Sequence, residues 1–408
     1  MTINMERSKA IPSESVFLEN VSYMFPKISK RKAIILIPPN GKIKRQDYTL
    51  ERLARSFREI DNISSTLLYI PDPSLPVDLS FFDRVIAVAN RHELFEQLNL
   101  IEHDVIIHRS WMHAYPFAAE LAKNYENVIV NIKDWNFAPE DVYRFLFNDD
   151  GCFEAIADIF HYSRKVLSHF TNEQALLWSK EYNVPTEKFL FFPEYCNTAH
   201  FIRKTVPSFV PLKLVYAGRI APTHLPEAYF PFKAHLRSIQ KLTAQNICID
   251  FVLPEHEYNH VQTHRKEFQD FLYEDRFNDR FNLIQGKSLD PNVLQPYHFG
   301  FFELEASGKN HLLYKYAVIS KFAFYMEAGI PILVNEKFVS IAELVKKHGL
   351  GIVFCNRDLD DFTAVTKISE EEYNRFLSNV DAFRQNYTYT AERVAEAFFE
   401  PLAQAESL

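Results

Sequence analysis

Short apolar runs alternate with amphipathic stretches over most of this chain, and this alternation constrains its fold more than any other feature. Continuous apolar runs rich in β-branched residues are typical of parallel strands that helices cover on both faces. In the first half, strands are expected at Ala33–Ile37, Thr66–Ile70, Arg84–Val88, Asp104–Ile107, Val128–Ile132 and, shorter, Leu190–Pro193. Helices are expected at Leu50–Ile60, Phe117–Tyr125 and, as one long segment, Phe153–Leu177. Repeated βαβ units of this kind predict a parallel sheet.

A second series of the same kind follows Asn197–Pro211, which has two prolines and little periodicity and is interpreted as a linker. Its expected strands are Lys213–Ala217, Ile247–Leu253, Phe281–Ile284, Gly300–Leu304, Pro331–Val334 and Gly351–Phe354. Its expected helices are Tyr229–Leu242, Glu255–Tyr273, Lys321–Ala328 and Ser340–Lys347, with closing helices within Glu370–Phe399. We therefore expect an α/β chain with two Rossmann-like domains facing across a cleft. The proposed division is an arm (1–30), a first domain (31–200), a second domain (201–385) and a C-terminal segment (386–408).

Composition narrows the class of protein. A chain of 408 residues suggests two or three domains. The net charge of -8 argues against binding to nucleic acid, which needs an excess of Lys and Arg. Only nine glycines exclude a glycine-rich phosphate cradle, and the four cysteines form no C-x-x-C pair. Because no signal peptide or long apolar span is evident, we expect a cytoplasmic protein.

The stretch 319–334 gives the clearest indication of a ligand-binding site. It reads as a serine N-cap at Ser320, a helix of about two turns, a glycine cap at Gly329 and a buried strand after Pro331. The first turn of a helix exposes N–H groups and the positive end of the dipole, and Lys321 adds a charge beside it. This arrangement favours a diphosphate, although an ordinary capped helix with a solvated lysine would look the same.

These residues resemble the nucleotide-sugar-binding segment of GT-B glycosyltransferases, closest to those that build bacterial surface glycans. The matching positions are Lys321, Tyr325, Gly329, Pro331, the run 341–345 and the run 349–352. Gly218-Arg219 resembles the turn under the donor phosphates, and Asp104–His108 resembles a strand end of the first domain. The resemblance, which covers roughly residues 100–360, implies a GT-B fold, a nucleotide diphosphate sugar as donor substrate, and a last helix that crosses back to the first domain.

The chain departs from the family pattern at several positions. Two glutamates that usually contact the sugar and the ribose are replaced by Tyr316 and Phe324, and His224 stands where a lysine is expected after Arg219. Glu303, Glu305 and Glu327 are nearby carboxylates that could replace the glutamates. Each of the three could equally be a solvated or capping residue.

Two residues are candidates for the base that activates an acceptor. Asp134 follows the strand at Val128–Ile132, in Lys133-Asp134 where the family usually has His-Asp, and His108 ends the strand before it. Asp134 could instead cap a turn, and His108 could be a core residue. Trp111 lies in the loop after His108, where an aromatic ring suits sugar binding or packs in the core.

A competing motif, H-E-x-x-H at 256–260, is the pattern of a zinc protease helix, with His264 extending it. It opens a helix inside an α/β repeat and has no third ligand by pattern. No metal site is therefore expected.

The function expected from these features is transfer of a sugar from a UDP-linked donor to a glycan or lipid-linked acceptor hydroxyl, without a metal or cofactor. Arg219, Ser320 and Lys321 would neutralise the leaving diphosphate. A basic region including Arg31, Lys32 and Lys42 could bring the protein to the inner face of a membrane, or could be solvated surface. The alternatives are a catalytically silent GT-B-like subunit or binding protein, and a nucleotide-sugar epimerase.

Overall fold

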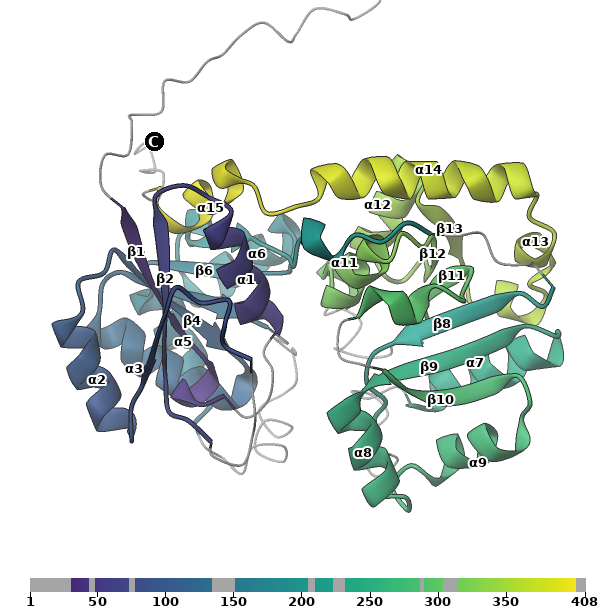
Figure 1. Ribbon diagram of the computed structural model, residues 1–408, viewed down its shortest axis with the longest axis horizontal. Helices are drawn as coiled ribbons and strands as arrows, with labels where there is room; N and C mark the ends of the chain where they lie inside the picture. Colours follow the sequence, from purple (N-terminus) through teal and green to yellow (C-terminus); the bar gives the residue numbers. More distant parts are fainter. Residues whose placement is uncertain are drawn as a thin grey trace, which may run out of the picture.

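A computed structural model describes residues 31–43, 48–72, 78–133, 151–204, 210–222, 232–286, 290–303 and 314–400. They form two α/β domains side by side, each built on one parallel sheet (Figure 1). The predicted architecture of two parallel sheets is therefore confirmed.

The first sheet has seven parallel strands in the order β3-β2-β1-β4-β5-β6-β7. They are β1 (Lys32–Ile37), β2 (Ile63–Tyr69), β3 (Arg84–Ala87), β4 (Val105–Ser110), β5 (Val128–Ile132), β6 (Lys165–Ser168) and β7 (Phe189–Phe191). The helices of this domain are α1 (Tyr48–Arg58), α2 (Arg91–Leu100), α3 (Tyr115–Asn124), α5 (Ala155–Tyr162) and α6 (Asn172–Tyr182). Strand β1 is buried on both faces: Ile34 and Leu36 pack in the layer of α1, whereas Ile35 and Ile37 pack in the layer of α2, α3 and α5. This burial explains why the strand reads as a continuous apolar run.

The second sheet has six parallel strands in the order β10-β9-β8-β11-β12-β13. They are β8 (Lys213–Ala217), β9 (Cys248–Pro254), β10 (Phe281–Gly286), β11 (Phe299–Phe302), β12 (Ile332–Asn335) and β13 (Gly351–Phe354). Its helices are α7 (Phe232–Ala244), α8 (Glu255–Thr263), α9 (Gln269–Phe277), α11 (Ser320–Glu327), α12 (Val339–His348), α13 (Thr363–Thr366) and α14 (Glu370–Asn386). In both sheets the first strand in sequence lies inside the sheet, so the strand order reverses beside β1 and β8. In open α/β sheets ligands bind at such a switch point, outside the carboxyl ends of the strands.

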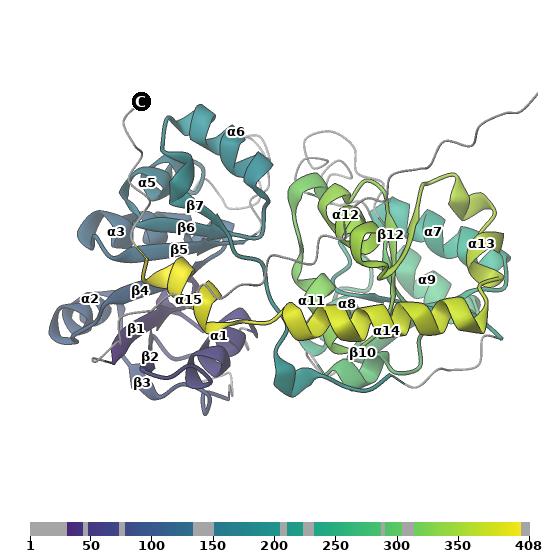
Figure 2. The ribbon, with the colours of Figure 1, turned by 90° about the horizontal axis from the view of Figure 1, so that it is seen from above.

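The last two helices connect the domains. Helix α14 runs along the second domain, and α15 (Ala391–Phe398) packs on the first (Figure 2). The Phe398 ring meets the Phe57 ring of α1 edge-on at a centroid distance of 5.6 Å. The Lys165 ammonium donates a hydrogen bond to the carbonyl oxygen of Glu396, with 2.6 Å between the heavy atoms. One hydrophobic core runs from α1 and α15 to α11 and α12, so the two domains share buried surface.

Two expected helices are wrong as single segments. The stretch 153–177 contains α5, the short strand β6 and the start of α6, because Lys165–Ser168 is a buried strand between β5 and β7. The stretch 255–273 divides into α8 and α9, since His264 leaves helical geometry at φ −105° and ψ 43°. Short 3-10 turns also occur, one of them at Met112–Ala114 after β4.

Tyr325 fastens α11 to the second sheet. Its buried hydroxyl accepts a hydrogen bond from the Ala217 N–H at 2.9 Å and lies 3.0 Å from the Val215 carbonyl oxygen, which it can reach as a donor. The ring lies against Gly300, where a Cβ atom would come within 2.5 Å of it. The glycine of β11 is therefore required by the close approach of this aromatic ring.

We expect Tyr325→Phe to lower the free energy of unfolding by about 1–3 kcal/mol, because the buried Ala217 N–H would lose its partner. Chemical denaturation measures the effect. Tyr273→Phe, at an exposed site on α9, is the control and should change stability by less than about 0.5 kcal/mol. Equal stability of the two variants would contradict this account of Tyr325.

Candidate active site

Residues from three elements meet at the switch point of the second sheet. Gly218 and Arg219 directly follow β8, Glu303 directly follows β11, and Lys321 is the second residue of α11. Because β8 and β11 are adjacent parallel strands, their carboxyl ends lie at the same edge of the sheet. The sequence singled out all four residues, and the fold brings them to this edge.

The Lys321 side chain lies against the end of β8. Its Nζ is 3.2 Å from the centroid of the Tyr216 ring and 5.7 Å from that of Phe302. A Cβ atom on Gly218 would come within 3.2 Å of both Cε and Nζ of the lysine. The absent side chain at Gly218 thus makes room for the lysine, and burial holds the pKa of its ammonium well below the usual range.

Arg219 reaches from the second domain to the first. Its Nε forms an ion pair with Oε1 of Glu257 at 2.8 Å, and its Cζ lies 5.2 Å from the centroid of the Trp111 ring. Trp111 follows β4 of the first sheet, so this site has walls from both domains. The backbone carbonyl of Arg219 accepts a hydrogen bond from the Tyr216 hydroxyl at 2.9 Å.

Glu303, directly after β11, is a buried carboxylate. Its Oε2 lies 3.5 Å from Nδ1 of His235 and has no hydrogen-bond partner among the described residues. The His235 ring packs 4.8 Å from the Tyr216 ring. A buried acceptor of this kind is costly unless a donor reaches it, and a hydroxyl group of a ligand is one such donor.

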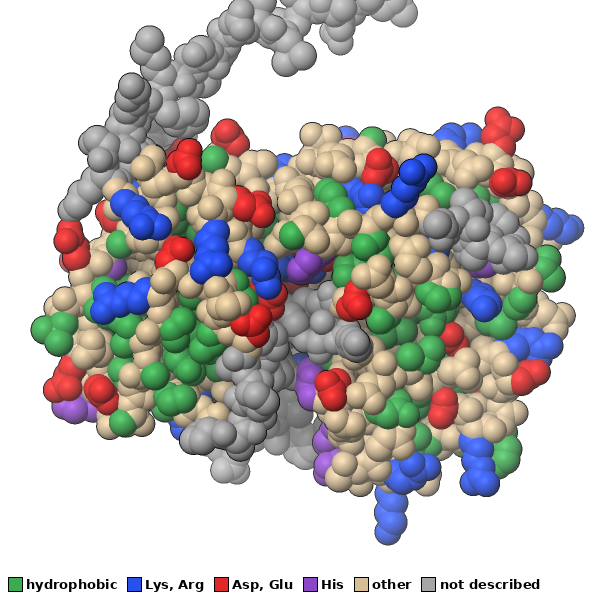
Figure 3. Space-filling view, viewed as in Figure 1, with side chains coloured by type: hydrophobic (Ala, Val, Ile, Leu, Met, Phe, Trp, Pro, Cys, Tyr) green, Lys and Arg blue, Asp and Glu red, His purple; other side chains and the backbone are tan. Residues whose placement is uncertain are grey.

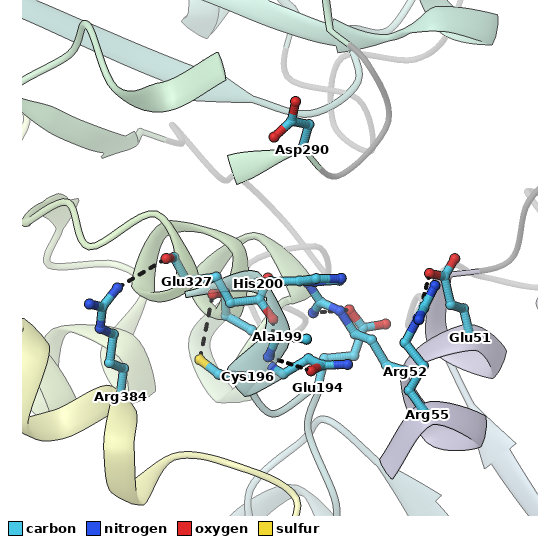
Figure 4. A network of polar contacts seen from close by, with 12 residues as sticks. Glu51, Arg52, Arg55, Glu194, Cys196, Ala199, His200, Asp290, Glu327 and Arg384 are labelled. Carbon is cyan, nitrogen blue, oxygen red and sulfur yellow. Dashed lines mark hydrogen bonds and ion pairs between the residues drawn. The ribbon is translucent and has the colours of Figure 1, made fainter. Parts of the chain in front are cut away.

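Glu327, predicted as a donor contact, lies instead at the junction of the domains (Figure 4). Its side chain is fully buried, with Oε2 2.5 Å from Nη2 of Arg52 on α1. Its Oε1 accepts a hydrogen bond from the Asn197 N–H at 2.7 Å. Both carboxylate oxygens of Glu327 therefore have protein partners. The hydroxyl of Tyr325, which also lies on α11, likewise has a protein partner in the core.

A second carboxylate completes this network from the first domain. Glu194 contacts Nη1 of Arg52 at 3.7 Å and also binds Lys133 and Thr49 at shorter range. Lys133, just after β5, donates to the Ser320 hydroxyl at 3.0 Å and so reaches the first residue of α11. A small cavity beside these groups is lined by Thr49, Asn131, Lys133, His169, Phe192, Pro193, Glu194 and Tyr389.

The expectation that Ser320 caps α11 is wrong. Ile319 is the N-cap residue, with no side-chain hydrogen bond, and Ser320 is already inside the helix. Its hydroxyl instead accepts a hydrogen bond from the Lys133 ammonium. Sequence reasoning also missed Arg52 and Glu194, because an isolated charged residue on a helix or loop carries no motif that shows its burial.

The two candidate bases have different outcomes. His108 is fully buried on β4, with its ring 5.3 Å from the Phe117 ring of α3. Burial, and then the charges of Arg109 and Arg91, lower its pKa to about 3. His108 is therefore a core residue rather than a lining of the cleft. Asp134 lies outside the described residues, as do His224 and Glu305.

The H-E-x-x-H stretch forms the first part of α8, but its residues do not converge. Glu257 is paired with Arg219 and with Nε2 of His256 at 3.2 Å, whereas the His260 ring packs 4.2 Å from that of His264. Within the described ranges, no group of three His, Cys, Asp or Glu residues could hold a metal ion.

Charges of both signs are interspersed on the face shown in Figure 3. In the basic region, Arg31 lies 3.9 Å from a carboxylate oxygen of Asp83, and Lys32 lies 3.1 Å from one of Asp104. Among the helices that the structure describes, none has the length and hydropathy needed to span a membrane.

We expect Arg52→Met to lower the free energy of unfolding by about 3–5 kcal/mol, because Glu194 and Glu327 would lose a buried counter-charge. Urea denaturation measures this change. The matched control is Arg55→Met on the same helix, whose pair with Glu51 is partly exposed and worth about 0–1 kcal/mol. A loss for Arg52→Met no larger than that of the control would refute the importance of this pair.

Comparison with known proteins agrees with this architecture. Residues 287–391 match the family described as glucosyltransferase 3-like, C-terminal domain. This range contains β11, α11, α12 and β13, and therefore Lys321 and Glu303.

Solved structures with similar folds cover nearly the whole chain. HepE from Anabaena, solved in complex with UDP-glucose, aligns with a TM-score of 0.57 at 12% identity over 90% of this chain and 98% of that one. An α,α-trehalose-phosphate synthase (UDP-forming) from Burkholderia vietnamiensis aligns with a TM-score of 0.56 at 10% identity over 90% and 98%. A mutant O-GlcNAc transferase from Thermobaculum terrenum aligns with a TM-score of 0.52 at 12% identity over 90% and 66%. The chain thus has the GT-B fold, and its residues 287–391 are similar to the glucosyltransferase 3-like C-terminal domain.

Proposed function

We propose that this protein transfers a sugar from a UDP-linked donor to a hydroxyl group of a glycan or lipid-linked acceptor. The observation that carries the proposal is the convergence of Lys321, Gly218 and Arg219 at the switch point of the second sheet. Two cationic side chains beside the start of a helix suit a diphosphate. The UDP-glucose bound to HepE, which has a similar fold, supports UDP as the nucleotide.

These residues would act on the leaving group. When the bond between the anomeric carbon and the diphosphate oxygen breaks, negative charge accumulates on the diphosphate, and fixed cations lower the energy of that state. Burial desolvates the ammonium of Lys321 and lowers its pKa, and a nearby diphosphate would favour its protonated form. Arg219 would supply a fork of donors for phosphate oxygens.

The sugar and acceptor contacts need other residues. The buried Oε2 of Glu303, which no described residue reaches with a hydrogen bond, is available to accept one from a hydroxyl of the donor. The acceptor hydroxyl must lose a proton as its oxygen bonds to the anomeric carbon, and we propose Asp134 as the base. Its neighbour Lys133 reaches Ser320 at the start of α11, which supports this choice. His108 is not proposed, because a buried group with a pKa of about 3 is a weak base at neutral pH.

We further propose that the reaction takes place in the cytoplasm, with the acceptor presented at the inner face of the membrane. The resemblance to enzymes that build surface glycans supports this proposal. A basic region around Arg31 and Lys32 would add attraction to an anionic surface, although both residues already have carboxylate neighbours.

A second candidate is a subunit that binds a nucleotide sugar without transferring it. It is favoured by the replacement of the two usual glutamates: Phe324 is buried, and the Tyr316 carbonyl accepts a hydrogen bond from the Thr171 N–H. Assays of transfer and hydrolysis over a panel of sugar nucleotides separate the two candidates. Binding of UDP without turnover of any donor would favour the silent subunit.

Lys321→Met and Arg219→Met should each weaken UDP binding by about tenfold to a hundredfold, the cost of one charge-assisted contact. Calorimetric titration measures the dissociation constant, and thermal stabilisation by UDP gives a second readout. Lys347→Met, at an exposed site on α12, is the control and should bind UDP as the unmodified protein does. Undiminished affinity in both site variants would overturn the proposed donor site.

We expect sugar transfer to persist after treatment with EDTA, because Arg219 and Lys321 provide the positive charge that the leaving diphosphate requires. The measurement is product formation with and without the chelator at a fixed donor concentration. Loss of activity that added Mg²⁺ or Mn²⁺ restores would show that a metal ion takes part.

A further inference from the structure

The guanidinium of Arg219 is held on two sides. Glu257 engages its Nε at 2.8 Å, and Trp111 lies 5.2 Å from its Cζ. The terminal nitrogens Nη1 and Nη2 have no side-chain or backbone partner within the described part of the chain. Glu257 thus contacts the Nε edge of the guanidinium and the Trp111 ring lies beside it, whereas no described residue contacts the two terminal nitrogens, the donors best suited to a phosphate.

We propose that Glu257 and Trp111 are positioning residues that hold Arg219 with its terminal nitrogens toward the donor diphosphate. This inference rests on the proposed function and extends it to two residues outside the diphosphate contacts. Glu257 belongs to the H-E-x-x-H stretch, so the inference also gives that sequence a role that requires no metal.

The sheet places Glu257 where this role requires it. Strand β9 is adjacent and parallel to β8, with Val252 opposite Ala217, so both chains leave the sheet at the same edge. Arg219 lies two residues after β8, and Glu257 lies in the first turn of α8, which follows β9 directly. The Glu257 side chain is only 16% exposed, so solvent and salt screen this ion pair less than a pair on the open surface.

A held arginine binds better than a free one. The Arg219 side chain is half-exposed, and a long side chain at the surface loses rotamer freedom when it is fixed on a ligand. A carboxylate at Nε restricts the rotamers of the Arg219 side chain before the ligand binds, so less conformational entropy is lost on binding. Because Nε and the terminal nitrogens lie in one rigid plane, fixing Nε also directs the other two donors.

The contact with Trp111, unlike that with Glu257, depends on how the two domains are placed. It comes from the first domain, and its ring contributes a cation–π contact to an arginine of the second domain. Arg219 is therefore fully held only when the two domains are apposed. The orientation of the domains and the affinity for the diphosphate should be coupled through this contact.

The test is a double-mutant cycle on UDP binding, measured by calorimetric titration. Glu257→Gln should raise the dissociation constant of UDP by about tenfold in the otherwise unmodified protein. In an Arg219→Met background the same substitution should change it by less than twofold, because the group that it positions is gone. Glu255→Gln, an exposed position in the same turn, is the control and should have no effect.

Trp111 is tested in the same way with a pair of variants. Trp111→Phe retains an aromatic face and should keep most of the affinity, whereas Trp111→Ala should weaken UDP binding severalfold. Neither variant should alter the binding of uridine, which has no phosphate. An equal loss for uridine would show that the tryptophan contacts the nucleoside and would overturn its assignment as a positioning residue.

The outcomes separate this inference from the proposed function. If Arg219→Met weakens UDP binding but Glu257→Gln does not, the donor site stands and the positioning role is refuted. Tighter binding by Glu257→Gln would also refute it, since the carboxylate would then compete with the diphosphate. If Arg219→Met leaves UDP binding unchanged, Arg219 does not contact the diphosphate and this inference fails; the donor site is overturned as well if Lys321→Met also leaves UDP binding unchanged.

Discussion

The buried ion pair between Arg52 and Glu327 joins the two domains at the point on which the site depends. Arg52 lies on α1 of the first domain and Glu327 at the end of α11 in the second. Two charges in an apolar setting are stable only when each is held by the other and by further hydrogen bonds. Glu194 and the Asn197 N–H provide these contacts. The pair therefore favours the arrangement of the domains in which both charges keep their partners.

Helix α11 connects the Arg52–Glu327 ion pair to Lys321. Its last residue, Glu327, is fixed to the first domain, while Tyr325 ties its middle to β8 and Lys321 near its start faces Gly218. The helix has only eight residues, so a shift at one end moves the other. Lys133 makes the same connection from the opposite side, through the Ser320 hydroxyl. Lys321, one of the two proposed diphosphate contacts, is thus placed by contacts made largely elsewhere on α11.

The sequence was sufficient for most strands of the two sheets but not for the direction of side chains. Buried parallel strands such as β5 and β8 read as uninterrupted apolar runs, and the expected limits of both agree with the structure. Strand β6 was missed because its apolar signal is only Val166-Leu167, and its buried Lys165 is explained by a carbonyl of α15 far along the chain. Gly218, Arg219 and Lys321 were selected from a helix start and a family resemblance, and the fold places them at one edge of the second sheet. Tyr325 and Glu327 lie on the same helix as Lys321, yet they point into the core and the domain junction, and a linear pattern does not distinguish these directions.

The environment of Phe324, which replaces one of the two glutamates usual in the family, explains why a carboxylate is absent there. Phe324 is buried in the apolar core shared by the domains, where a carboxylate would be costly without a counter-charge. Glu303 comes from a different element, the end of β11, where His235 and the Tyr216 ring already form a partly polar wall. A carboxylate is therefore still present beside the proposed diphosphate contacts, reached from a strand rather than from the helix. Recognition of a sugar hydroxyl depends on where an acceptor oxygen lies, and the same chemistry is compatible with either origin.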